Sequence, residues 1–198
     1  LRQKNYDKLN NLSNVTVIDG TASFLSNTEV LIKKDGAENK VSADKIFINT
    51  GSTAVIPDIE GINNNPKVFT SETLMELEKL PRNLTIIGGG YIGLEFASMY
   101  SNFGSRVTVI QDGGVFISKE DRDIANEIQK VLEENGVSFI FSAKTYKIDG
   151  ADVYYKKEEN DFILNGDAVL IATGRRPNTD GLCADKAGVE LTARGAVK

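Results

Sequence analysis

The sequence contains no histidine and only one cysteine, Cys183. One cysteine excludes an internal disulfide framework, and without histidine few of the usual metal ligands remain, so no metal site is predicted. No apolar run approaches the ~18 residues of a membrane-spanning helix, and no signal-peptide pattern is present. Acidic residues outnumber basic ones, 28 to 23, and the basic residues form no cluster. We therefore expect a cytoplasmic protein with neither a membrane nor a nucleic-acid partner.

A length of 198 residues, with 40% apolar and 26% charged residues, is enough to bury the core of one or two globular domains. The chain begins at Leu1 rather than at a methionine. We therefore expect a piece of a longer protein.

The most informative stretch is residues 84–97, which contains the motif Gly-Gly-Gly-Tyr-Ile-Gly. A β-branched run precedes this G-x-G-x-x-G pattern, a helical apolar pattern follows it, and a second apolar run begins at Arg106. This order predicts a dinucleotide site. Gly88 is expected to make the turn, Gly90 to let the backbone approach a pyrophosphate at the helix start, and Gly93 to let the helix pack on the sheet. The alternative is a glycine-rich turn without a ligand.

Hydrophobic periodicity and turn residues predict the other elements. Before the glycine motif they are a helix, a strand, an antiparallel meander, an apolar strand and a short helix capped by Thr70, over residues 1–12, 15–20, 21–41, 44–52 and 70–80. After it they are a strand, a helix, a strand, a second meander and a strand, over residues 106–110, 120–134, 137–141, 145–164 and 167–174. The apolar face of the helix at 120–134 consists of Ile124, Ile128, Val131 and Leu132.

Two segments of the chain end alike. Residues 44–51 and 167–174 each begin with aspartate, continue with apolar strand residues and end with Thr-Gly, and each follows a predicted meander. This similarity indicates an internal repeat, although a chance match of two strand ends is the alternative. In the first copy the glycine fingerprint would lie before Leu1. The sequence thus predicts an α/β fold, with a Rossmann-like parallel sheet that carries a β-meander, joined to part of a similar domain.

Four stretches, taken together, are specific for a known family. They are Asn49-Thr50-Gly51-Ser52 with Pro57, Thr70-Ser71-Glu72 before Leu80-Pro81, Ile87 to Glu95, and Ala172 to Thr179. In this order they resemble the class I FAD-dependent pyridine nucleotide-disulfide oxidoreductases, the group of dihydrolipoamide dehydrogenase, glutathione reductase and mercuric reductase. The resemblance implies a partial FAD-binding domain at residues 1–69, an NAD(P)H-binding domain at 70–174, and a return segment to the FAD domain at 175–198.

The resemblance also implies a function for the parent protein. In this family a hydride passes from NAD(P)H through FAD to a redox-active cysteine pair. That pair lies upstream of the matching region and the catalytic His-Glu pair lies downstream, so no catalytic residue is predicted here and the chain alone is expected to be inactive. Two alternatives are a non-catalytic nucleotide-binding or regulatory module, and a parent of the single-cysteine peroxide or coenzyme-A disulfide reductase type. The family implies a homodimeric parent. Disulfides, lipoamide, mercuric ion and oxidised thiocyanate all stay open as the electron acceptor.

Several residues match family positions that contact NAD(P)H. Tyr91 matches the tyrosine that covers the nicotinamide pocket and moves when the coenzyme enters, the alternative being a packed aromatic residue at a helix start. Glu95 matches the acid beside the nicotinamide, and a charge between apolar neighbours is costly unless it meets a partner. Thr145 and Gly174 match positions whose backbone meets the adenosine and nicotinamide ends, the alternative being plain strand structure. The full NAD(P)H set is Gly88, Gly90, Tyr91, Ile92, Gly93, Glu95, Gln111, Asp112, Thr145 and Gly174.

The choice of coenzyme depends on the end of the second strand of the motif. A carboxylate there binds the ribose 2′-hydroxyl, whereas arginine accepts a 2′-phosphate. Gln111 occupies the acidic position, while Asp112 and Ser118 stand where NADP-using relatives carry arginine. Because Asp112 would repel phosphate, NADH is favoured over NADPH.

The flavin site is expected to be incomplete. Ala22, Thr50, Gly51 and Ser52 match positions where the family backbone approaches FAD, which we expect in the full-length parent. Arg175 is expected to anchor the flavin or to join the domains, with a plain surface arginine as the alternative. Cys183 has no neighbouring base and is expected to be an incidental thiol.

Overall fold

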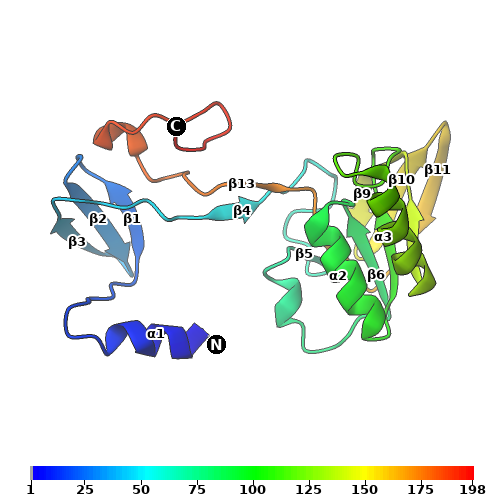
Figure 1. Cartoon of the computed structure of the whole chain (residues 1–198), viewed down its shortest axis with the longest axis horizontal. Coiled ribbons are helices and arrows are strands. Elements are labelled where there is room, and N and C mark those ends of the chain that lie inside the picture. The colour runs from blue at the N-terminus through cyan, green and yellow to red at the C-terminus, as the bar shows by residue number, and fades with distance from the viewer. Residues whose placement is uncertain (1) are drawn as a thin grey trace. The chain divides into compact units, whose positions relative to one another are not determined.

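A computed structural model describes residues 2–198 of the chain (Figure 1). The chain divides into two compact units, of which the first contains the described residues up to Ser52 together with Pro177–Lys198. The second unit, Thr53–Arg176, contains the glycine motif. This unit begins at Thr53, whereas the sequence places the start of the NAD(P)H domain at residue 70. Which unit serves which nucleotide stays a prediction.

The first unit contains the expected meander. Strands β1 (Thr21–Phe24), β2 (Glu29–Lys34) and β3 (Ala37–Ser42) form an antiparallel sheet in the order β1-β2-β3, and the unit also holds helices α1 (Arg2–Asn10) and η2 (Ala184–Ala187). Asp35 and Gly36 join β2 to β3 with φ angles of 49° and 82°. Two successive left-handed residues make the tight hairpin turn that an Asp-Gly pair favours. The sequence prediction of a hairpin here is confirmed.

Two expected strands of the first unit are absent from the described residues. Residues 15–20 have no strand structure, and neither do residues 44–51, where the side chain of Phe47 is 88% exposed. A strand needs a neighbour to satisfy its backbone N–H and C=O groups, and no described strand pairs with these segments. Of the strand expected at residues 44–52, only Ser52 lies in a strand, as the first residue of β4 (Ser52–Ala54), which pairs with β13 (Arg175–Pro177). The strands that the apolar pattern predicts at these two segments are therefore absent from the described part of the chain.

The second unit is built on a parallel sheet of order β5-β12-β6-β7-β8. Its strands are β5 (Val68–Phe69), β12 (Ala168–Ile171), β6 (Asn83–Ile87), β7 (Arg106–Ile110) and β8 (Val137–Ile140). All four residues of β12 are buried, as are the last four of β6. Continuous apolar runs of this kind belong to a sheet that is covered on both faces.

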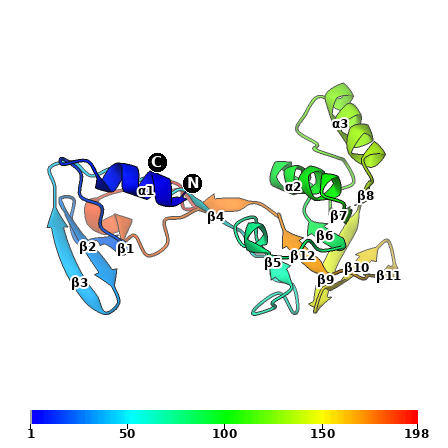
Figure 2. The same ribbon diagram turned by 90° about the horizontal axis from the view of Figure 1, so that it is seen from below.

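Alternate residues of these strands face different layers. Ile86 and Val109 belong to the apolar cluster that includes helices α2 (Tyr91–Asn102) and α3 (Arg122–Glu134). Ile87 and Ile110 belong to a second cluster, with residues of the meander β9 (Ala143–Asp149), β10 (Asp152–Lys157) and β11 (Asn160–Leu164). This alternation follows from the two-residue period of a strand. Figure 2 shows the helices on one side of β6 and β7 and the meander on the other. The expected Rossmann-like sheet with a meander is confirmed.

The short helix expected at residues 70–80 is only one 3₁₀ turn, η1 (Leu74–Glu76). The Thr70 hydroxyl accepts weakly from the backbone N–H groups of Glu72 and Thr73, at 3.3 and 3.4 Å, and the Thr73 hydroxyl accepts from Thr70 N–H at 2.9 Å. These local bonds compete with a continuous helix. The expectation was thus wrong in length. Within residues 2–198, no helix is both long enough and apolar enough to cross a lipid bilayer.

Helix α3 buries less of its apolar face than expected. The carboxylate of Asp121 accepts from the N–H groups of Asp123 and Ile124 and so caps the helix start. Leu132 is 6% exposed, but Ile124 is 58% exposed. Ile128 and Val131 are also largely exposed. The apolar face therefore borders a groove rather than the core.

Candidate dinucleotide-binding site

Three loops meet at the carboxyl edge of the parallel sheet. They follow β6, β7 and β12, which are neighbours in the sheet, so their ends lie side by side. The loops and the start of α2 enclose a cavity of about 350 Å³. It is lined by Gly88, Gly89, Gly90, Tyr91, Gln111, Val115, Ile117, Ser118, Lys119, Ala172, Thr173 and Gly174. Five residues of the predicted NAD(P)H set, Gly88, Gly90, Tyr91, Gln111 and Gly174, are thus brought together.

Two glycines of the motif are required by the fold itself. Gly88 has a φ of +112°, and a Cβ atom there would lie 2.4 Å from the carbonyl oxygen of Ala172. A Cβ atom on Gly93 would lie 2.1 Å from the carbonyl oxygen of Gly88. No side chain fits at either distance. Gly88 therefore permits the turn and Gly93 permits the close contact of α2 with β6, as the sequence predicts.

Gly90 is different because the fold places no such demand on it. Its φ and ψ angles, −83° and 178°, are open to any residue, and a Cβ atom would meet nothing within 4 Å. Of the eighteen glycines, all of which lie in the described part of the chain, the others have either a positive φ or a neighbour that a Cβ would crowd. A glycine at this position leaves space in the cavity that a side chain would fill.

The start of α2 faces this space with unused hydrogen-bond donors. Gly90 is the N-cap residue and provides no side-chain acceptor. The first helical bond from the backbone runs from Leu94 N–H to the carbonyl oxygen of Gly90. The preceding N–H groups therefore have no acceptor within the helix, and the helix dipole makes this end positive. Lys119 lines the same cavity and adds a positive charge. This combination favours an anionic ligand such as a diphosphate.

Gln111 presents an acceptor to the cavity. Its side-chain nitrogen donates to the carbonyl oxygens of Gly113 and Val115, at 3.1 and 2.8 Å. The side-chain oxygen lies beside Gly89, where an added Cβ would come within 2.2 Å of it. Because the loop occupies both amide hydrogens, the side chain offers its oxygen to a ligand, as a carboxylate would.

A second hollow of about 400 Å³ adjoins the first, because Gly88, Gln111 and Thr173 line both. Asp112 and Thr145 lie in its wall, together with Pro57, Asp58, Ile59, Ile87, Ile110, Gly113, Ala143 and Lys144. The hydroxyl oxygen of Thr145 is buried and has no hydrogen-bond partner among the described residues. A buried hydroxyl without a partner is costly.

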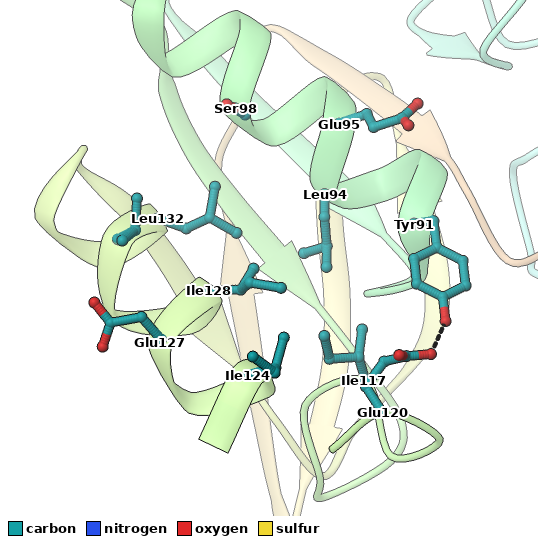
Figure 3. Close-up of a pocket in the computed structure, with 11 residues that line it drawn as sticks. Tyr91, Leu94, Glu95, Ser98, Ile117, Glu120, Ile124, Glu127, Ile128 and Leu132 are labelled. Carbon is teal, nitrogen blue, oxygen red and sulfur yellow. Dashed lines mark hydrogen bonds between the residues drawn. The ribbon is translucent and has the colours of Figure 1, made fainter. Parts of the chain in front are cut away.

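Tyr91 and Glu95 lie where α2 borders a groove of about 460 Å³ (Figure 3). The groove lies between α2 and α3 and is lined mainly by apolar side chains, including Leu94, Ile128 and Leu132. Glu95 is exposed at its wall. The burial cost that suggested a partner for Glu95 therefore does not arise. Contact of Glu95 with a nicotinamide stays a prediction.

The hydroxyl of Tyr91 donates a hydrogen bond to the carboxylate of Glu120 (Figure 3). This bond is the main reason that the pKa of Tyr91 lies above its ordinary value, with burial and the negative charge of Glu120 adding to it. The ring itself is largely solvent-exposed, at 62%. Tyr91 is therefore not the packed aromatic residue of the alternative interpretation.

The sequence interpretation missed four polar or glycine positions of the site, Gly89, Lys119, Glu120 and Thr173. Gly89 stands between the two glycines that were assigned roles. Lys119 and Glu120 belong to the loop that follows β7, and loops at the carboxyl ends of parallel strands are where ligands of such sheets bind. The position of that loop was the available signal. The side chain of Ile92, which was predicted, packs against the apolar cluster beneath α2, and its contact with NAD(P)H stays a prediction.

The predicted FAD positions have structural partners of their own. The carbonyl oxygen of Thr50 accepts from the Asn178 side chain at 3.3 Å, and that of Gly51 accepts from Asn178 N–H at 3.0 Å. Ala22 lies on β1. In the second unit, Arg175 donates to the carboxylate of Glu72 at 3.2 Å. Their contacts with a flavin, and that of Ser52, stay predictions.

Comparison with known proteins assigns the chain to a family. The family model described as pyridine nucleotide-disulphide oxidoreductase matches residues 2–198. The chain belongs to the pyridine nucleotide-disulphide oxidoreductase family. This confirms the resemblance inferred from the four motifs. Membership in the family implies FAD and a pyridine nucleotide as cofactors.

Several members of the family are similar along the chain. The probable pyridine nucleotide-disulfide oxidoreductase RclA of Escherichia coli K12 is 41% identical over 197 residues, which are 100% of this chain and 45% of that protein. Dihydrolipoyl dehydrogenase of Bacillus subtilis 168 is 34% identical over 183 residues, 91% of this chain and 40% of that protein. The solved structure of the HOCl-induced flavoprotein disulfide reductase RclA from Escherichia coli has a TM-score of 0.89 at 41% identity, covering 100% of this chain and 45% of that one. The chain thus spans less than half the length of these relatives.

Proposed function

We propose that the second unit, Thr53–Arg176, binds NADH, and that the complete protein passes its hydride through FAD to a redox-active cysteine pair. This proposal rests mainly on Gly90, where a Cβ atom would meet nothing within 4 Å, so packing does not explain the glycine. A diphosphate at this position would use the space in front of Gly90, the free N–H groups of α2 and the charge of Lys119. Membership in the family supports the proposal over a non-catalytic module.

The other residues of the site fit the remaining parts of a dinucleotide. The side-chain oxygen of Gln111 would accept from a ribose hydroxyl, and the backbone of Thr145, in the wall of the adjoining hollow, would meet the adenosine end. Tyr91, Glu95 and Gly174 would border the nicotinamide end. When bound, the nicotinamide supplies the hydride. This chain's residues hold and orient the coenzyme, and no residue of the chain takes part in the transfer as a catalytic group.

NADH is preferred over NADPH on the same geometry. Gln111 directs an acceptor oxygen toward the glycine turn because its two amide hydrogens are used by the loop. An oxygen acceptor binds a 2′-hydroxyl but repels a 2′-phosphate. Asp112, in the wall of the adjoining hollow, adds a negative charge against phosphate, which offsets the positive charge of Lys144 in the same wall. Lys119 is the cation that lines the cavity, and the diphosphate common to both coenzymes accounts for it.

Calorimetric titration of the chain with NADH, NADPH and ADP-ribose tests the proposal. We expect saturable binding of NADH and ADP-ribose and weaker binding of NADPH. Gly90→Val should weaken NADH at least ~10-fold, about 1.4 kcal/mol, because its methyl groups fill the diphosphate position. The melting temperature should fall only by the cost of a less favourable N-cap residue, about 1 kcal/mol or less, since the position is otherwise open. Ala37→Val, on exposed β3 of the first unit, is the control. Equal affinity of Gly90→Val and the unsubstituted chain would contradict the proposal.

We also propose that the complete protein is a homodimer, as the family resemblance implies, and that it is cytoplasmic. The single cysteine of the chain agrees with a reducing compartment. Light scattering of the complete protein after size-exclusion chromatography should give twice the monomer mass. A mass of one chain would contradict this assembly.

A further inference from the structure

The bond between Tyr91 and Glu120 joins two parts of the chain that form different walls of the site. Tyr91 is the first residue of α2, and Glu120 ends the loop that connects β7 to α3. Tyr91 lines both the glycine-lined cavity and the groove between α2 and α3, whereas Glu120 lines only the groove. The bond therefore directs the phenol toward the groove side (Figure 3).

The bond is the main polar restraint on an otherwise exposed ring. A phenol that donates to a carboxylate makes a charge-assisted hydrogen bond, which is stronger than a neutral one. The raised pKa of Tyr91 agrees with this contact, since Glu120 is its first cause. The other charged groups nearby are Glu95, one turn further along α2, Lys119, beside Glu120 in the loop, Glu127 on α3, and Arg122, whose guanidinium donates to the backbone carbonyl oxygen of Glu120.

The cavity is open with this bond in place. Gly88, Gly89 and Gly90 line it, and in front of Gly90 an added Cβ would meet nothing within 4 Å, so this part of the cavity has room for an aromatic ring. Removing exposed aromatic surface from water lowers the free energy of the protein. Without the bond, the ring of Tyr91 can lower its exposure by turning over the glycines, and it would then cover the space that the coenzyme needs.

We propose that Glu120 is a positioning residue that holds Tyr91 clear of the glycine-lined cavity and so keeps the cavity open to a nucleotide. This proposal rests on the proposed function for the identity of the nucleotide. Glu120 itself does not contact the ligand. Its role is exerted through the tyrosine ring.

Binding of NADH to a set of variants tests this role. Glu120→Ala should weaken binding about 5-fold, and Glu120→Gln, which keeps an acceptor oxygen, should recover most of the loss. Glu127→Ala is the matched control, because Glu127 lines the same groove without bonding to Tyr91. In the Tyr91→Ala background, Glu120→Ala should have no further effect, since no ring remains to be positioned. An equal loss with and without the ring would show that Glu120 acts by charge alone and would overturn the proposal.

A measurement without ligand separates this proposal from the proposed function. In NMR spectra of the chain with ¹³C-labelled tyrosine, assigned with Tyr91→Phe, Glu120→Gln should lower the pKa of Tyr91, whereas Glu127→Gln should not. In Glu120→Ala, new NOE contacts from the Tyr91 ring to Gly90 or Ala172 should appear. An unchanged titration and unchanged NOE contacts would overturn the positioning role even if NADH binds. Loss of all coenzyme binding by the unsubstituted chain, with these spectral changes present, would instead refute the proposed function alone.

Discussion

The side-chain oxygen of Gln111 occupies the place where a side chain on Gly89 would begin. An ideal Cβ on Gly89 would come within 2.2 Å of it. The amide cannot easily rotate away, because its nitrogen is bonded to the carbonyl oxygens of Gly113 and Val115. The middle glycine of the motif thus makes room for the first residue after β7. The glycine turn and the loop after β7 are one packed unit.

This contact predicts the effect of Gly89→Ala. The new methyl group must displace the Gln111 amide and break its two bonds to the loop, which should cost about 1–3 kcal/mol as a case of overpacking. The melting temperature should fall and NADH affinity should fall with it. Gly90→Ala is the control, because there a methyl group meets open space. Differential scanning calorimetry that gave equal stability for the two variants would contradict the contact.

Asp112→Arg should shift the coenzyme preference. The substitution replaces a carboxylate with a guanidinium group in the hollow beside Gln111, and such a group can bind a 2′-phosphate through paired hydrogen bonds. We expect NADPH affinity to rise at least ~10-fold relative to NADH affinity, which corresponds to about 1.4 kcal/mol. Asp44→Arg, exposed in the first unit, gives the same change of net charge and should leave the ratio unaltered. An unaltered ratio in Asp112→Arg as well would place the ribose pocket elsewhere.

Gly93→Ala should destabilise the second unit. Its methyl carbon would lie 2.1 Å from the carbonyl oxygen of Gly88, and both atoms belong to rigid elements, so α2 must move away from β6. The expected loss is about 3 kcal/mol or more, because the shift also disturbs the core beneath the helix. Met99→Ala, exposed on the same helix, is the control. Urea unfolding followed by circular dichroism gives both values, and similar midpoints would show that the helix can shift at little cost.

The glycine motif and the parallel sheet could be predicted because their signals are local. Strands β6, β7, β8 and β12 are mainly apolar runs whose neighbours in the sheet are present in the chain, and β12 is buried along its whole length. The similar run at residues 44–51 has the same pattern but no strand beside it among the described residues, and Phe47 is 88% exposed. A strand's pattern shows that it can pair. It does not show that a partner is in reach.

The site was predicted in part for the same reason. Gly88 and Gly93 have roles set by backbone geometry close to them, and these follow from the motif. Glu120 was missed because its contact with Tyr91 depends on how the loop after β7 folds back over a distance of 29 residues in sequence. No periodicity in the sequence encodes that return. The expected role of Glu95 likewise assumed burial that only the packing of α2 could decide.

Two substitutions on the apolar face of α3 test which part of that face is buried. Leu132 lies in the apolar cluster at 6% exposure, so Leu132→Ala removes buried methyl groups and should cost about 2–4 kcal/mol. Ile124 has a similar side chain on the same helix but is 58% exposed, so Ile124→Ala should cost under about 1 kcal/mol. Urea unfolding measures the loss of stability in both variants. The two variants are comparable because each replaces an aliphatic side chain on the same helix with alanine. If Ile124→Ala proved as costly as Leu132→Ala, the groove would be closed in solution and α3 would lie against α2 along its whole apolar face.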